Sequence, residues 1–503
     1  MLVTDNQQRT SPLHGYALIF LHLIAGLAIG CLIIFDPYGT TCLNHLAGIK
    51  LLPFTFSLLI FVIVVALFFL AKYLGKNIAK ILENKELLFV IFYIAGYQTS
   101  ALQLGIVDAS DLALGVFLLV VLIDAFVKEK KNFINTPINL LNLLLLVFIL
   151  LPLVNLRLPS RTQFVYTKVI LMFFLMANCL YSKKLVIKGV KWLIIITSCS
   201  AVFAIFQEFM WITTGTLVIG MIPKSELKRM FESGLFRVPA FMLSYRMLAI
   251  LLSSTLIITI SFLVFPNPLV TGIKKRLFLY VASFAMFAAL LLTMAKDVLL
   301  GFFVALMLLL IMRKRRYIFH SAVVILLLII IMLTLLAYLP GKGDTISYIV
   351  RDIPKIERER IQLNRDGIQG FLWSDYKLSG RGKGGKYTDN FLGWPAHNAF
   401  ILILDEAGIF GFIIYLSMYI WALFRLICLN LVVKDPVYLP VVKGLLCGII
   451  IYFIGAQFIA AYVEPFLWVL FALTESTALI LANKQVPFHR TGNIMIDNDF
   501  SVR

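Results

Sequence analysis

Long stretches without a charged side chain constrain this sequence more than any other feature. Six of them cover residues 10 to 35, 51 to 71, 87 to 107, 132 to 156, 247 to 273 and 317 to 341. A helix needs about 20 apolar residues to cross the hydrocarbon core of a bilayer, and each stretch is long enough. Only 14% of the 503 residues are charged, against roughly a quarter in soluble proteins. The pattern predicts an all-α, polytopic integral membrane protein.

We expect about 12–14 membrane helices. Fourteen candidates lie near residues 13 to 35, 51 to 71, 87 to 107, 112 to 127, 138 to 154, 164 to 181, 192 to 213, 241 to 265, 277 to 295, 298 to 312, 318 to 339, 407 to 429, 441 to 463 and 466 to 483. The first stretch exceeds the apolar part of a secretory signal, so we expect it to remain as the first span.

The distribution of lysine and arginine predicts the orientation. Alternate connections, together with both tails, hold 23 of these residues, whereas the short connections on the other face hold four. Because basic loops stay on the cytoplasmic side, both termini are expected in the cytoplasm. The net charge of +19 then reflects topology and lipid headgroups. No basic soluble domain remains for a nucleic acid.

This topology divides the chain into four parts. Spans occupy residues 1 to 339, interrupted by an outer connection at 214 to 240. A long outer loop follows at 340 to 397, then C-terminal spans at 398 to 483 and a cytoplasmic tail at 484 to 503. In the long loop, Ile361, Ile368, Phe371 and Leu372 share one helix face, which predicts an amphipathic helix resting on the membrane or on the bundle.

The densest polar motif is WPAHNAFILILDEAGIFGF, residues 394 to 412. Pro395 suits the first turn of a helix, which would put His397 and Asn398 at a helix N-terminus. The positive end of a helix favours a bound phosphate and a neutral imidazole, so His397 is a candidate general base. The alternative is an interfacial histidine bonded to a backbone carbonyl. Glu406 falls on the opposite helix face and is expected to be structural.

Cations on the same outer face form a second group. Arg237 precedes a span and Arg246 lies inside it, where it either lines a watery cavity or reaches to the interface. Lys296 and Asp297 occupy a tight turn and either pair with each other or face a substrate. Together with Arg365, Arg381 and neighbouring lysines, these cations suit a diphosphate. Solvated loop charges are the alternative, above all for Lys383 and Lys386.

The remaining polar groups do not define a further site. The six cysteines form no C-x-x-C pair, and no acidic cluster supplies a third ligand, so neither a metal nor another cofactor is expected. Glu208, Asp124 and Glu475 lie within predicted spans, where they either mark a proton path or bond neighbouring helices. Gly408 and Gly411 would permit close helix approach.

These motifs resemble the O-antigen ligase and O-antigen polymerase superfamily of bacterial membrane glycosyltransferases, over roughly residues 230 to 430. The family's H-N-x-x-L and E-x-G-x-x-G are similar to HNAFI at 397 to 401 and EAGIFG at 406 to 411. Arg365 through Gly382 is similar to its arginine, amphipathic stretch and G-x-G turn. Arg237 with VPAFMLSYR departs from the usual G-T-F-x-N-P-N, and Lys296 stands where arginine is usual.

The resemblance implies transfer of a glycan from undecaprenyl diphosphate to an acceptor hydroxyl at the periplasmic face of the bacterial inner membrane. His397 would be the base of a metal-independent, inverting reaction. Arg237 and Arg381 would bind the diphosphate, with Lys296 and Arg365 as weaker candidates, and Asn398 would orient the donor or the histidine.

The acceptor is the lipid A core for a ligase and another glycan for a polymerase, and the sequence leans only slightly to the ligase. Membrane lipids are expected partners, a chain-length regulator is left open, and no nucleic acid is implied. The alternative from another class is a lipid-linked oligosaccharide flippase or transporter, against which stands the long outer loop.

Overall fold

The computed structural model describes the chain in several stretches. They are residues 89 to 91, 93, 94, 103, 104, 107, 108, 161 to 214, 238 to 240, 242, 244 to 313, 358, 361 to 369, 371 to 373, 377, 378, 380, 398 to 458 and 465 to 482. The predicted spans at 13 to 35, 51 to 71, 112 to 127, 138 to 154 and 318 to 339 lie outside them.

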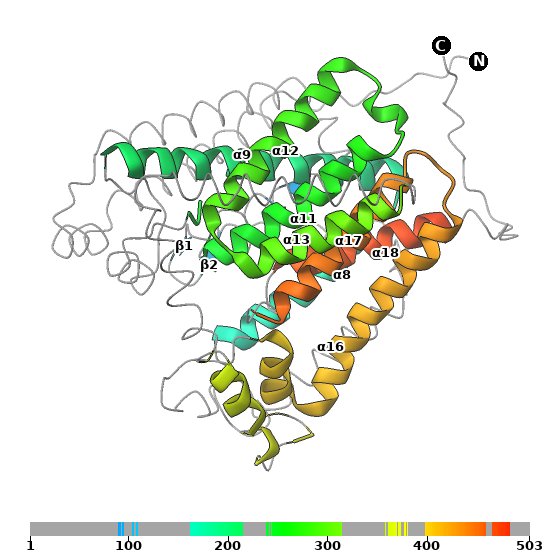
Figure 1. Ribbon diagram of the computed structural model, residues 1–503. Coiled ribbons are helices and arrows are strands. Elements are labelled where there is room, and N and C mark those ends of the chain that lie inside the picture. Colours follow the sequence, from blue (N-terminus) through cyan, green and yellow to red (C-terminus); the bar gives the residue numbers. More distant parts are fainter. Residues whose placement is uncertain are drawn as a thin grey trace, which may run out of the picture.

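The described chain is an all-α polytopic membrane protein (Figure 1). Its long helices are α8 (Arg161–Cys179), α9 (Lys183–Thr214), α11 (Tyr245–Val264), α12 (Ile273–Thr293), α13 (Lys296–Ile311), α16 (Ala399–Val432), α17 (Leu439–Ala456) and α18 (Pro465–Ala482), with a short 3-10 turn, η2 (Pro268–Val270). Five of them, α9, α11, α12, α16 and α17, are long and apolar enough to cross a membrane.

A two-residue hairpin is the exception to the helices in the described chain. Strand β1 (Gln103–Leu104) pairs with β2 (Val107–Asp108) in antiparallel register. The predicted span from 87 to 107 is therefore wrong at its C-terminal end, although residues 89 to 91, 93 and 94 are helical.

Helices α11 and α17 form the centre of the bundle. Glycines of α17 face α11: a Cβ at Gly444 would lie 2.8 Å from Ser261 Oγ, and one at Gly455 3.4 Å from Ile250 Cδ1. Ser261 also donates a 2.7 Å hydrogen bond to the carbonyl of Pro440. Without a hydrophobic drive between helices in lipid, small residues and hydroxyls of this kind hold helices together.

The contacts along α17 show which helix ends lie together at each end of the bundle. Gly455, near the C-terminus of α17, lies beside Ile250 in the second turn of α11, and Gly301, in the second turn of α13, lies beside Ile451 and Ile454. The N-termini of α11 and α13 therefore flank the C-terminus of α17. We call this end of the bundle the mouth end, and the end where α9, α12 and α17 begin the opposite end.

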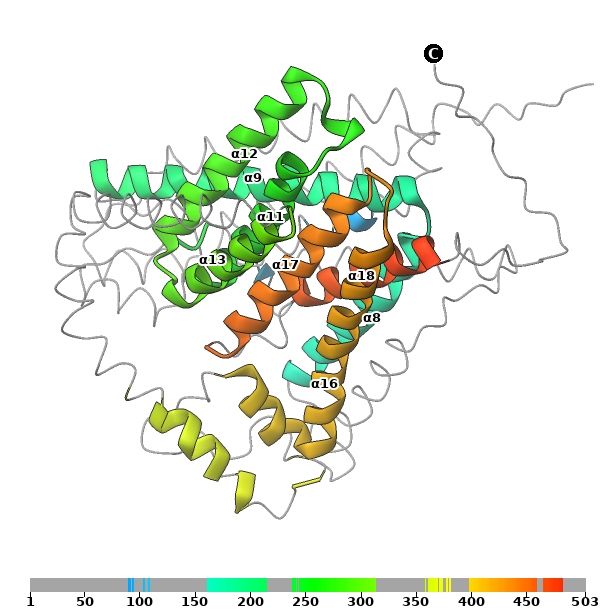
Figure 2. The same cartoon turned by 45° about the vertical axis from the view of Figure 1, so that its right-hand side comes forward.

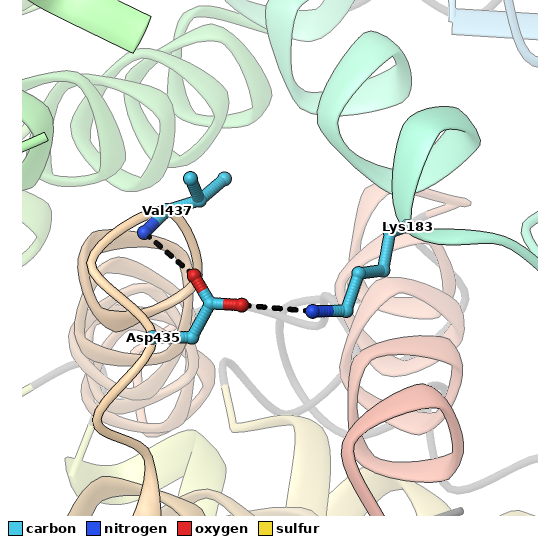
Figure 3. Close-up of polar contacts among 3 residues, drawn as sticks. All are labelled: Lys183, Asp435 and Val437. Atoms are coloured by element: carbon cyan, nitrogen blue, oxygen red, sulfur yellow. Dashed lines mark hydrogen bonds and ion pairs between the residues drawn. The ribbon is translucent and has the colours of Figure 1, made fainter. Parts of the chain in front are cut away.

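Side chains tie the helices together at the opposite end (Figure 3). Lys183, the first residue of α9, donates to Asp435 Oδ2 at 2.8 Å, and Asp435 Oδ1 accepts from the backbone N–H of Val437 at 3.0 Å. The Lys183 ammonium also lies 5.0 Å from the ring centre of Tyr438. Burial, followed by the neighbouring charge of Asp435, raises the pKa of Tyr438, so this hydroxyl stays neutral.

A buried carboxylate connects α16 to α18. Glu475 Oε1 accepts a 2.9 Å bond from Trp421 Nε1, and its Oε2 lies 3.9 Å from Arg425. The sequence left two interpretations of Glu475, a proton path or a bond to a neighbouring helix, and this contact matches the second. Glu208 is also buried, in α9, and Asp124 lies outside the described residues.

Several predicted helix boundaries were wrong at charged residues. The lysines from Lys183 to Lys191 belong to α9, and Lys274 to Arg276 form the first turn of α12, although we expected both groups in connections. Long basic side chains let a helix continue into the headgroup region. Helix α17 ends at Ala456, whereas its span was predicted to reach residue 463.

Candidate functional site

The chain forms a helical hairpin at the mouth end, where the sequence predicted a helix N-terminus at His397 and Asn398 that leads into a membrane span from residue 407. Helix α16 begins at Ala399 and changes direction at Gly408, whose φ of 68° and ψ of −171° are not helical. Figure 2 shows the result: a short limb, residues 399 to 407, and a long limb, residues 409 to 432, meet in a V below the end of α17. We call this the mouth hairpin.

A segment of the long outer loop holds the bend of this hairpin. The backbone N–H of Ile409 donates a 2.9 Å bond to the carbonyl of Lys377. A Cβ on Gly408 would overlap the backbone of Leu378 and Gly380, and a Cβ on Gly380, which has a φ of 75°, would overlap the carbonyl of Glu406. Both positive φ angles and both close approaches require glycine. The loop is thus docked to the mouth hairpin through contacts between their backbones.

This contact assigns roles to the E-x-G-x-x-G residues. Glu406 is buried and its carbonyl faces the outer loop at Gly380, a position that suits a structural role. The close approach expected of Gly408 is to that loop and not to another helix. At Gly411, an added Cβ would overlap the side chain of Ala407, so this glycine lets the two limbs of the hairpin close on each other.

An aromatic cluster fixes the short limb against the bundle. The Phe400 ring lies 5.6 Å from Tyr415 and 5.7 Å from Tyr419, both on the long limb, and 5.4 Å from Phe453 on α17. Rings at these separations attract each other beyond the area that they bury. The N-terminus of the short limb is therefore positioned beside the C-terminus of α17.

Asn398 caps the short limb and lies at the helix N-terminus expected from the sequence. Its Oδ1 accepts from the N–H groups of Phe400 at 2.9 Å and Ile401 at 3.2 Å. Its Nδ2 donates to Gln457 Oε1 at 3.2 Å. Because Oδ1 must face the two amides, the orientation of the amide group is fixed. Asn398 thus fixes the start of the helix, one residue after His397 in the sequence.

Gln457 is a site residue that the sequence analysis missed. It forms the C-cap of α17, and its Nε2 donates to the carbonyl of Phe453 at 3.5 Å while its Oε1 accepts from Asn398. The only available signal was an amide side chain next to Gly455 and Ala456 near the end of an apolar run. Such a pattern is common in membrane proteins and is not specific to any motif.

Arg246 and Lys296 lie in the first turns of α11 and α13, at the mouth end. Helix α11 begins at Tyr245 rather than near 241, because Met242 N–H bonds to Pro239 O in a turn and Ser244 caps the helix by accepting from Arg246 N at 3.2 Å. Arg246 is therefore an end residue of the helix and not one buried well inside a span. Its guanidinium lies 5.6 Å from the ring centre of Tyr245.

Lys296 and Asp297 are helical, where the sequence predicted a turn. Met294, with φ at 55°, ends α12, and α13 begins at once with Lys296. Asp297 suits the first turn of a helix because its charge complements the positive end. Among the described residues, the ion pairs are Lys183 with Asp435 and Arg425 with Glu475, so Lys296 and Asp297 do not pair with each other.

Three helix N-termini thus converge at the mouth end: those of α11, α13 and α16. Each end carries about half a positive charge. Arg246 and Lys296 add two cations beside these ends, and the carboxylate of Asp297 offsets one of them. Such a surface attracts an anion, and phosphate groups bind at helix N-termini for this reason. Within the described residues no group of three potential ligands for a metal ion is found.

Three predicted site residues, His397, Arg237 and Arg381, lie outside the described residues. Each is next in sequence to a described one: His397 precedes the cap Asn398, Arg237 precedes Val238, and Arg381 follows Gly380 at the hairpin contact. Lys383 and Lys386 also lie outside. Arg365 is described and is exposed on the outer loop.

Comparison of the chain with the models of known protein families, and with curated protein sequences, finds no match.

Proposed function

We propose that the protein is an O-antigen ligase-type glycosyltransferase. It transfers a glycan from undecaprenyl diphosphate to an acceptor hydroxyl, on the lipid A core or on a growing polysaccharide, at the periplasmic face of the inner membrane. The observation that carries the proposal is the convergence of three helix N-termini and two cations at the mouth end, with His397 directly before one of those termini.

In the proposed reaction, His397 removes the proton of the acceptor hydroxyl. The oxygen attacks the anomeric carbon, the bond from that carbon to the diphosphate oxygen breaks, and undecaprenyl diphosphate leaves with the electron pair. Attack opposite the leaving group inverts the configuration. A helix N-terminus disfavours an imidazolium, which keeps the histidine ready to accept a proton.

Cations stabilise the departing diphosphate. Arg237 and Arg381 are the proposed direct ligands, and Lys296 and Arg246 add positive charge from the first turns of α13 and α11. Arginine forks bind phosphate oxygens in pairs, whereas a lysine contributes a point charge. The reaction needs no metal, so we expect transfer by the purified protein to survive excess EDTA.

Deletion of the gene, followed by complementation with wild type or His397→Ala, tests the class of function. Surface polysaccharide would be measured for both chain length and lipid attachment. Free lipid A core, with long chains left on undecaprenyl diphosphate, supports a ligase. Cores that carry a single repeat support the polymerase of the same superfamily. Full complementation by His397→Ala at equal expression would favour the flippase or transporter.

A further inference from the structure

In the helical segment of the outer loop, residues 361 to 369 and 371 to 373, three of the four side chains of the predicted apolar face are exposed, and Phe371 is half-buried. Ile361, Ile368 and Leu372 are 66%, 42% and 55% exposed, whereas Leu363 is 8% exposed. At 100° per residue the first three lie within about 40° of one another, and Leu363 lies about 160° from their centre. The helix therefore packs on the protein through Leu363. Of the two surfaces predicted for its apolar face, the exposure of these three side chains favours the membrane.

An exposed aromatic residue and exposed cations lie beside this face. Trp373 is 84% exposed, and Arg358, Arg365 and Lys377 are also exposed. Arg365 lies about 40° from Ile361 around the helix. Tryptophan is enriched where membrane meets water, and arginine stems cover apolar surface while their charged heads reach phosphate groups. We call Ile361, Ile368 and Leu372 the outer apolar patch.

The patch is followed along the chain by a segment that contacts an exposed apolar surface on a candidate membrane span. On the candidate span α16, Ile413, Ile420, Phe424 and Ile427 are exposed large side chains, which continue toward the bend at Phe410 and Ile409. Lys377, four residues after Trp373, bonds to Ile409 there. Leu378 is exposed too, and its carbonyl lies against Gly408. An apolar surface thus continues from α16 into the outer loop.

We propose that the outer apolar patch inserts into the bilayer leaflet at the mouth end. Its three side chains enter the boundary between headgroups and acyl chains, as amphipathic helices at membrane surfaces do. Arg365, exposed beside this face, binds lipid phosphate. The mouth hairpin is then held from two sides, by the bundle through Phe400 and by the membrane through the docked loop.

Photo-cross-linking tests this inference without any glycan transfer, so it is independent of the proposed function. The full chain is reconstituted in vesicles of phosphatidylethanolamine and phosphatidylglycerol, with p-benzoylphenylalanine in place of Ile368 or Leu372. Gln362 is the matched control, because it is exposed on the same helix about 100° from Ile361. Ile420, on the lipid-facing stripe of α16, is the positive control. Lipid adducts are counted by mass spectrometry of the intact protein.

We expect lipid adducts at 368 and 372 at yields near that of 420 and at least five times that of 362. Equal yields at 368 and 362, or no lipid adduct at 368 while 420 gives one, would overturn the proposal. A cross-link from 368 to a polypeptide would overturn it as well, because it would identify a protein as the occupant. Ile361 as a third probe position guards against a single probe that disturbs the helix.

Discussion

A lysine lies in the first turn of a helix at each end of the bundle, and the two lysines have different surroundings. At the opposite end, Lys183 begins α9 with a carboxylate at 2.8 Å and an aromatic ring nearby, so the cation serves packing. At the mouth end, Lys296 begins α13 beside the N-termini of α11 and α16. Cations at positive helix ends oppose folding and favour a bound anion. We propose that the cation at the opposite end serves stability and that the cations at the mouth end serve a substrate.

The largest effect is expected at the bend of the mouth hairpin. Gly408→Ala places a Cβ into the backbone of the docked loop. It also forces alanine into a backbone conformation, φ 68° and ψ −171°, that is nearly restricted to glycine and costs about 1–3 kcal/mol, before any overlap is counted. We expect transfer to fall below detection and the melting temperature to drop, as measured by activity assay and thermal unfolding in detergent.

Gly448→Ala is the matched control for this substitution. An added Cβ at Gly448 would meet nothing closer than 3.7 Å, so this variant should keep both activity and stability. Normal transfer by Gly408→Ala would show that the docked loop does not position the site.

Removal of a cation at the mouth end comes next. Lys296→Ala and Arg246→Ala should each lower kcat/KM for the lipid-diphosphate donor by about 10²–10³, as loss of one charge-stabilising group does, with the melting temperature unchanged. Lys275→Ala removes an exposed lysine from the first turn of α12 at the opposite end, and its kcat/KM should equal that of wild type. Equal losses in Lys275→Ala and Lys296→Ala would mean that net charge, and not position, matters.

The cap of the short limb should give a smaller effect. Asn398→Ala removes the acceptor for two amides and should lower the free energy of unfolding by about 0.5–2 kcal/mol, with kcat reduced because His397 loses its fixed position. Gln457→Leu leaves the cap intact and removes only the support of Asn398, so kcat should fall less. A larger loss of kcat in Gln457→Leu than in Asn398→Ala would contradict this order.

The smallest effect is expected at the opposite end. The Lys183–Asp435 pair is about one-third exposed on each side, and pairs near solvent contribute about 0.2–1 kcal/mol. Lys183→Met should therefore lower the melting temperature slightly, less so at high salt, and leave transfer unchanged. A loss of transfer would connect this end to the site.

The sequence predicted the helices better than it predicted where they bend. Apolar runs placed α8, α9, α11 to α13 and α16 to α18 in the right order because lipid demands about 20 apolar residues from each span. The bend at Gly408 depends on Gly380 and Lys377, which lie far away in the sequence. No local pattern contains that contact, so Gly408 was interpreted only as a site of close helix approach.

The site residues show the same difference between features set by local sequence and features set by contacts far apart in the sequence. Asn398 lies at a helix N-terminus as expected, because the capping preference is local. Gln457 was missed because its partner lies 59 residues away. The amphipathic helix was predicted from its spacing, but which face meets the protein depends on Leu363, and periodicity cannot assign that. The mouth-end position of Arg246 was misjudged because a turn at Pro239 delays the start of α11.

The central claim, that the mouth end transfers a glycan from a lipid diphosphate with His397 as base, is tested most directly with purified protein. Wild type, His397→Ala and Lys275→Ala would be given undecaprenyl-diphosphate glycan and acceptor, and the released undecaprenyl diphosphate measured. We predict release by wild type and Lys275→Ala, and a loss of at least 10²-fold in His397→Ala at an equal melting temperature. Release by His397→Ala at the wild-type rate would contradict the account.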